Sequence, residues 1–162
     1  MYKRQDKLIK SGELTPINIK NSLPITYYAF TEKIDNYAPT RKTKKLHILS
    51  PFDNLIILRK RVENIFDFAY TLECYVTAKK RKVGYFSLPI LYGNSFVGQV
   101  DLKADRKAKI LRIQNLVWET SLKKPAQIYS SFIKKLNAFA TFNGCEKIES
   151  NTNIGDLADM LF

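Results

Sequence analysis

The sequence predicts an α+β protein in which a short helix–ribbon segment precedes a small antiparallel β-barrel or curled sheet with a C-terminal packing helix. Three observations support this class. Apolar residues alternate in short runs between Leu46 and Trp118, and turn-forming residues separate these runs. Pro125 opens one long stretch in which apolar residues recur at helical spacing. A shorter helical stretch and two strand-like runs occupy the first thirty or so residues.

The segment 1–38 has the order of the second half of a winged helix, a helix followed by a two-stranded ribbon. A helix that ends at Gly12 is followed by strand-like runs at 13–19 and 25–30. A short helix with Thr31 as its N-cap comes next. The first helices of such a module would lie before the first residue of this chain. We therefore expect the segment to be a partial winged-helix remnant.

A basic polar linker at 39–45 is expected to separate this remnant from a second domain, 46–162, that is barrel-like and binds DNA. Alternating runs in the second domain predict strands at 46–49, 70–76, 85–91, 96–103 and 109–118, and a helix at 59–66. The runs 70–76 and 85–91 are expected to pair as a hairpin.

The clearest helix is predicted near the C-terminus, at about 125–143, and Gly144 is its expected terminator. Its apolar stripe consists of Ile128, Phe132, Leu136 and Phe139. This stripe predicts that the helix packs against the sheet. An edge strand at 146–150 and a terminal helical turn at 154–162 complete the prediction.

The composition is typical of a folded chain that stays in the cytoplasm. Hydrophobic residues make up 45% and aromatic residues 12% of the sequence, which is enough to form a core. No apolar run approaches the roughly 20 residues that span a bilayer. The N-terminus lacks the apolar core of a signal peptide. Cys74, Cys145 and His47 have no zinc-site or disulfide spacing, so we expect no metal or cofactor.

The net charge of +12 resides in residues 1–118, because residues 119–162 are neutral overall. Such a positive field concentrates polyanions, although basic charge alone also fits a chain that is merely kept in solution. The predicted hairpin tip carries four consecutive cations between Tyr75 and Tyr85, and a phosphate backbone would offset their mutual repulsion. The alternative is a solvated loop that protects a sheet edge. The predicted DNA-binding residues are Lys79, Lys80, Arg81, Lys82, Tyr85, Lys103, Arg106, Lys107, Arg59 and Arg61.

Catalytic groupings are scarce in the sequence. There is no phosphate-binding glycine loop, and a nucleophilic triad would have to use His47, which has no local signature. Asp101 and Asp105 lie on one face of a predicted strand, so a hydrolase with a site at this pair is one alternative function. A surface ion pair with Lys103 is the commoner outcome. A protein-interaction module whose basic surface only keeps it in solution is another alternative.

Two stretches of the second domain resemble the winged-helix crosslink-repair DNA glycosylases of the YcaQ/AlkZ type. The first is SPFDNL at 50–55, and the second runs from YTLECYV at 70–76 to VDLKADRK at 100–107. The resemblance covers 46–113 well and 1–37 more loosely. It implies tandem winged-helix units before a C-terminal β-barrel, with a basic concave surface that grips damaged duplex DNA near the nucleoid.

The resemblance also implies hydrolysis of the glycosidic bond of alkylated or crosslinked purines. The family positions the attacking water with a Gln-x-Gln or Gln-x-Asp motif in its N-terminal part. Gln99-Val100-Asp101 matches this motif as a string but lies in the barrel segment, so we interpret the match as accidental. The expected chain is a C-terminal half without catalytic residues. It is then a truncated product, a split-gene half that pairs with a catalytic N-terminal partner, or a degenerate copy.

Overall fold

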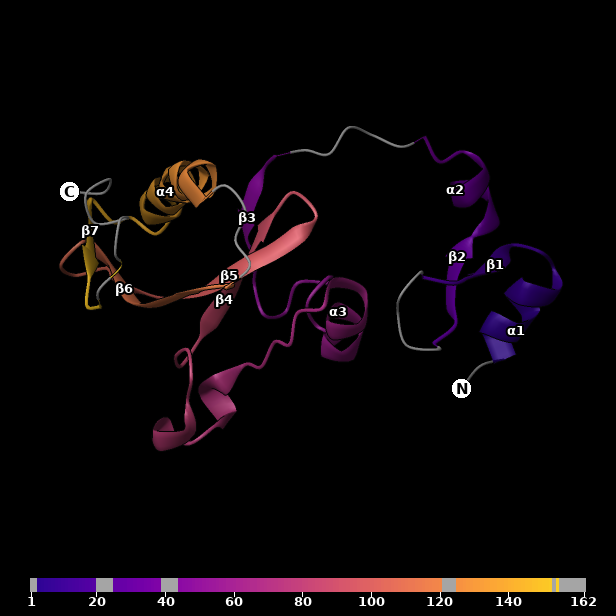
Figure 1. Ribbon diagram of the computed structural model, residues 1–162, viewed down its shortest axis with the longest axis horizontal. Coiled ribbons are helices and arrows are strands. Elements are labelled where there is room, and N and C mark those ends of the chain that lie inside the picture. Colours follow the sequence, from indigo (N-terminus) through magenta and orange to yellow (C-terminus); the bar gives the residue numbers. More distant parts are fainter. Residues whose placement is uncertain (1–2, 20–24, 39–43, 121–124, 153, 155–162) are drawn as a thin grey trace. The chain divides into compact units, whose positions relative to one another are not determined.

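The computed structural model describes residues 3–19, 25–38, 44–120, 125–152 and 154. The chain divides into two compact units, Met1–Arg41 and Lys42–Phe162, and each is described by itself. Unit 1 contains helix α1 (Lys3–Lys10), the ribbon strands β1 (Leu14–Ile17) and β2 (Tyr27–Phe30), and helix α2 (Thr31–Asp35) (Figure 1). The ribbon is antiparallel, as the alternating runs predict.

The start of α2 is joined to the ribbon through Thr31. This residue is not the N-cap that the sequence predicts, because Phe30 occupies that position and makes no side-chain cap. The Thr31 hydroxyl instead donates to the Gly12 carbonyl at 2.6 Å and lies 2.8 Å from the Thr15 hydroxyl. The tertiary partners across the ribbon have therefore displaced the local cap. Gly12 has a φ of 76°, the left-handed conformation expected after a helix.

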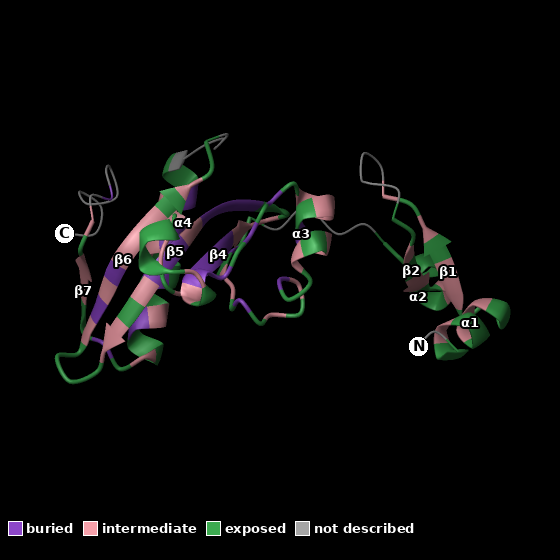
Figure 2. Cartoon of the chain, turned by 90° about the horizontal axis from the view of Figure 1, so that it is seen from below, coloured by how far each residue is buried: buried purple, intermediate pink, exposed green. Residues whose placement is uncertain are grey.

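Unit 1 has little core of its own. None of its described residues is buried, and Figure 2 shows only half-buried and exposed colours on α1, β1, β2 and α2. A two-stranded ribbon with one short helix at each end is marginal by itself. The order of elements is the one predicted for a winged-helix remnant, and that assignment remains a prediction.

Unit 2 is a mixed α+β domain built on a curled five-stranded half-barrel sheet. The strands, in spatial order, are β3 (Leu46–Ile48), β4 (Ser87–Tyr92), β5 (Ser95–Asp105), β6 (Ile110–Trp118) and β7 (Lys147–Ser150). Neighbours are antiparallel except β6 and β7, which are parallel because α4 connects them. Register shifts interrupt the β4–β5 and β5–β6 pairs. These bulges bend the sheet.

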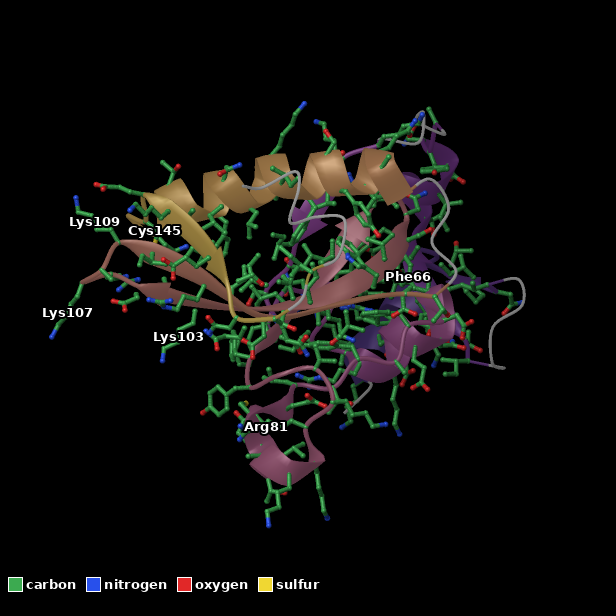
Figure 3. All side chains as sticks on the ribbon, turned by 60° about the vertical axis from the view of Figure 1, so that its left-hand side comes forward. Phe66, Arg81, Lys103, Lys107, Lys109 and Cys145 are labelled. Atoms are coloured by element: carbon green, nitrogen blue, oxygen red, sulfur yellow. The ribbon has the colours of Figure 1, made fainter. Side chains whose placement is uncertain are left out.

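Helix α4 (Pro125–Phe142) covers one face of the sheet (Figure 3). Its buried side chains pack against alternate residues of the strands, among them Val100 and Leu111. The buried residues of the helix are Ile128, Phe132, Leu136 and Ala140. The predicted packing helix is thus confirmed, with Phe139 half-buried at the margin. The predicted terminal turn at 154–162 lies outside the described residues except for Ile154.

A second apolar cluster lies in the part of unit 2 that contains α3 (Arg59–Phe66). Phe96 of β5 stacks on Phe68 with ring centroids 4.5 Å apart, and the Phe66 ring meets Phe96 edge-on at 5.3 Å. Val62 of α3 is fully buried in this cluster. The sheet therefore separates two cores.

The predicted hairpin between 70–76 and 85–91 is wrong. Residues 70–76 form no strand, and two short 3-10 turns, Glu73–Tyr75 and Ala78–Lys80, lie in this segment. β4 pairs instead with β3 and β5. The alternation of YTLECYV would turn Glu73 to solvent, whereas its carboxylate is buried and accepts main-chain hydrogen bonds. A buried charge with that many partners overrides strand periodicity.

Candidate nucleic-acid interface

Residues Glu73–Phe86 form an irregular segment, here called the basic loop, that leads into β4. Its organising group is the carboxylate of Glu73, a residue that is only 7% exposed. The carboxylate accepts hydrogen bonds from three successive main-chain N–H groups, those of Lys82 at 2.8 and 3.0 Å, Val83 at 2.8 Å and Gly84 at 2.9 Å. Such charge-assisted bonds are stronger than neutral ones. They fix the path of the loop after its 3-10 turns.

A second buried carboxylate, that of Asp101 on β5, lies against the next part of the loop. A Cβ atom on Gly84 would stand 2.1 Å from an Asp101 carboxylate oxygen, so only glycine fits there. The Asn115 side chain of β6 donates to the Val83 carbonyl at 2.6 Å. The loop is therefore fastened to two strands of the sheet.

The pKa values of the two carboxylates are shifted in opposite directions. Burial raises the pKa of Glu73, but the N–H groups of Lys82, Gly84 and Val83 and the Lys82 charge outweigh it, so the pKa lies below its ordinary value. Burial also raises the pKa of Asp101. There the main-chain N–H groups of Phe86 and Tyr85 and the Arg81 charge do not compensate, and the pKa stays above its ordinary value.

Arg81 lies in the middle of the basic loop and is half-buried. Its Nε donates to the carbonyls of Glu73 at 3.2 Å and Val76 at 3.0 Å. The guanidinium carbon stands 4.9 Å from the centre of the Tyr85 ring, in cation–π contact. The sequence predicts Arg81 as a phosphate contact, and the structure shows that it also holds the loop together.

Three other predicted cations of the loop are exposed, namely Lys79, Lys80 and Lys82. Among the described residues, the ion pairs are Lys109 with Glu146 and Arg112 with Glu149. None of the three loop lysines therefore forms an ion pair within the described part of the chain, although the Lys82 charge acts on the Glu73 carboxylate. The charges of Lys79 and Lys80 are open to a ligand.

A second group of predicted cations lies at the end of β5. Lys103 is exposed on β5, and Arg106 and Lys107 are exposed on the turn to β6. Val100, Leu102 and Ala104 pack toward α4, so strand alternation places Lys103 on the opposite face. Figure 3 shows Lys103 and the Arg81 loop on this same side of the sheet. The structure thus brings Lys103 and the basic loop to one side of unit 2, and Arg106 and Lys107 lie beyond Lys103 on the turn.

The cations of the third predicted group, on α3, contact other residues of the fold. Arg59 is half-buried, and its guanidinium carbon lies 5.7 Å from the centre of the Tyr70 ring. Arg61 donates to the carbonyls of Asn54 and Leu55, the latter at 3.2 Å. Arg61 thus supports the segment before α3, and Arg59 contacts the segment after it. The sequence alone does not distinguish them from Lys60, which is exposed.

The carboxylates of Asp101 and Asp105 lie on one face, as alternation predicts, but they are four residues apart on β5. At about 3.3 Å per residue their Cα atoms are roughly 13 Å apart, beyond the spacing of a paired-carboxylate site. The Ala108 N–H donates to Asp105 at 3.0 Å and occupies it in the turn. Among the described residues, no three His, Cys, Asp or Glu side chains gather as a metal site would need.

The motif-like string Gln99-Val100-Asp101 is also absorbed by the fold. The Ser87 hydroxyl donates to the side-chain amide oxygen Oε1 of Gln99 at 3.3 Å. Val100 is fully buried toward α4. The role of Glu73 has no counterpart in the sequence prediction. The signal that would have revealed it is an acid inside an apolar run, followed by a cationic stretch and a glycine.

Comparison with solved structures gives weak likenesses. Two crystal structures of an aminoglycoside acetyltransferase from an uncultured soil metagenomic sample, with trehalose and with sisomicin, are 18% and 17% identical to this chain. Each match covers 72% of this chain and 82% of the other, with a TM-score of 0.39. At that score the likeness carries no argument.

No helix in the described part of the chain is long and apolar enough to span a bilayer.

The family comparison agrees with the resemblance found in the sequence. The model of the family described as DNA glycosylase AlkZ-like matches residues 3–141, which is most of the chain and includes the basic loop and the sheet through β6. The chain belongs to the AlkZ-like DNA glycosylase family.

Proposed function

We propose that this chain serves DNA repair as a duplex-binding module, with unit 2 supplying the phosphate contacts. The family supports a DNA-repair role. One observation carries the rest of the proposal. The exposed lysines of the basic loop and Lys103 of β5 are on one side of the sheet, further exposed cations follow on the β5–β6 turn, and none of these side chains forms an ion pair among the described residues. The cations are Lys79, Lys80, Lys82, Lys103, Arg106 and Lys107.

Unpaired cations on a fixed framework favour a polyanion for two reasons. Their mutual repulsion is relieved when phosphates lie between them, and each phosphate that is neutralised releases counterions. The loop is already ordered by Glu73 and Arg81, so binding does not have to order it. Contacts of this kind position a duplex and carry no sequence preference.

We further propose that residues 1–162 do not themselves carry the catalytic motif of the family. The family's glutamine motif is matched in this sequence only by Gln99-Val100-Asp101, whose side chains are engaged in the sheet. Purified chain mixed with a duplex that contains methylated purines is expected to release no base. If base is released and the release survives replacement of Gln99 and Asp101 by alanine, the chain has a catalytic site elsewhere. If the release is lost on that replacement, the match of Gln99-Val100-Asp101 to the motif is not accidental.

The binding proposal is tested by fluorescence anisotropy with a labelled duplex over a salt series. Four to six phosphate contacts predict a log–log slope of about −4 to −5. The variant Lys79→Glu/Lys80→Glu should lose most of its affinity and reduce the slope by roughly 2, because two phosphate contacts disappear. The matched control Lys134→Glu/Lys135→Glu changes the net charge equally on exposed positions of α4 and should retain the slope.

Equal losses in the two double variants would mean that net charge, and not this surface, attracts the DNA. Absence of saturable binding at low salt would overturn the proposal altogether. It would favour the protein-interaction module, whose basic surface serves only to keep the chain in solution.

A further inference from the structure

The basic loop has an inverted burial pattern. It buries the charged side chain of Glu73, yet it exposes two aromatic rings, Tyr75 at 86% and Tyr85 at 57%. Elsewhere in unit 2, rings such as Phe68, Tyr70 and Phe96 are in the core. A buried acid beside exposed large rings is the informative departure from ordinary burial. In this loop the buried side chain is the one that holds the backbone, and the aromatic side chains are exposed to solvent.

The two exposed rings lie on the most firmly held part of the loop. Arg81 bonds the carbonyls of Glu73 and Val76, which are on either side of Tyr75 along the chain. The same guanidinium covers the Tyr85 ring at 4.9 Å. No described side chain stacks on Tyr75. Arg81 thus contacts the Tyr85 ring and the main chain on both sides of Tyr75, and neither ring is used to fill a core.

Rings interleaved with unpaired cations are the combination that binds unstacked nucleobases. An aromatic ring supplies a face on which any base can stack, and the neighbouring lysines hold the phosphates on each side of that base. Lys79, Lys80 and Lys82 are those neighbours here. In an intact duplex both faces of each base are already stacked. An exposed ring therefore gains little there and much from a base that has left the helix.

We propose that Tyr75 and Tyr85 form a stacking site for an unpaired nucleobase, so that the chain prefers DNA with a displaced base over intact duplex. This inference rests on the proposed DNA-binding function and deepens it. The Arg81 guanidinium backs the Tyr85 ring and keeps its orientation, and the lysines anchor the flanking phosphates.

The test uses three labelled probes of one sequence: an intact duplex, a duplex with a single bulged 2-aminopurine, and the same bulge with an abasic nucleotide. Wild-type protein is expected to bind the bulged base roughly 5- to 150-fold more tightly than the abasic bulge, the range for one stacked base. Emission of the 2-aminopurine should change on binding, because it reports stacking directly.

Variants then assign the effect to the rings. Tyr75→Leu/Tyr85→Leu keeps apolar bulk and should abolish the preference while affinity for intact duplex stays within about twofold. Tyr75→Phe/Tyr85→Phe keeps both rings and should retain the preference. Phe142→Leu, at the 88% exposed end of α4, is the matched control and should behave as wild type. Thermal melts establish that each variant is folded. The comparison of the three DNA probes with wild-type protein does not depend on any variant.

Equal binding of the base-containing and abasic bulges by wild type would overturn the stacking site while leaving duplex binding intact. Retention of the preference in the leucine variant would overturn it as well. Failure to bind any of the three probes would instead remove the proposed function together with this inference.

Discussion

The Glu73 carboxylate offers the sharpest test of how the basic loop is held. Replacing Glu73 by alanine removes the acceptor of three main-chain N–H groups. Hydrogen bonds to a charged group contribute about 1.5–3 kcal/mol each, which bounds the loss at roughly 4–9 kcal/mol. Lys82 is exposed and Val83 and Gly84 are half-buried, so we expect water to reach their N–H groups when the carboxylate is gone. We therefore expect a loss near the lower bound, about 4 kcal/mol.

The assay is thermal unfolding followed by circular dichroism. For a unit of this size, about 4 kcal/mol corresponds to a lowering of Tm by roughly 15 °C. Glu73→Gln keeps one acceptor oxygen and should lose about half as much. Glu63→Ala, which removes the same charge from an exposed position of α3, should remain within about 0.5 kcal/mol of wild type. A loss below about 1 kcal/mol for Glu73→Ala would refute the reasoning.

Acidification gives an independent check on the same group. Because the folded-state pKa of Glu73 lies below its ordinary value of 4.5, its stabilisation is complete above that value. It is lost as the pH falls from there through the lowered pKa. Wild type should lose this component on acidification, and Glu73→Ala should not. Parallel curves for the two proteins would contradict the assignment.

Two further predictions concern the neighbours of Glu73. Gly84→Ala forces a Cβ to within 2.1 Å of Asp101 and should lower the free energy of urea unfolding by about 1–3 kcal/mol. Gly144→Ala should lose less, because a Cβ there meets nothing within 4 Å and only the φ of 71° is strained. Equal losses in the two variants would contradict the contact with Asp101. Because burial raises the pKa of Asp101, wild type should gain stability as the pH falls through that raised pKa toward the ordinary value of 3.8. Asp101→Asn should lack this gain in pH-dependent melts, and an identical gain in the variant would argue against it.

The regular parts of unit 2 were predictable from local pattern. The apolar stripe of α4 and the alternation along β5 and β6 are enforced by a single buried face, so periodicity and structure agree. Even the placement of Asp101 and Lys103 on the side of β5 opposite α4 follows from alternation. The parallel pairing of β7 with β6 was not predictable, because it depends on where α4 returns the chain.

The basic loop was predictable in composition but not in form. Its cations and flanking tyrosines are evident in the sequence, whereas the hairpin expected there is absent. The form depends on contacts between residues far apart in sequence, such as Asn115 with Val83 and Asp101 with Gly84. The same limit applies to Arg59 and Arg61, because their contacts with the Tyr70 ring and the Leu55 carbonyl keep them half-buried.

The Glu73 clamp has an evolutionary consequence. It grips the loop through main-chain N–H groups, which every residue except proline possesses. Exchanges at Lys79, Lys80 and Lys82 can therefore drift in charge and size without redirecting the backbone, and binding strength can be retuned while the scaffold is inherited unchanged. Gly84 is the exception, since any side chain there meets Asp101. Divergence among relatives should accordingly concentrate on the lysines and spare Glu73, Gly84 and Asp101.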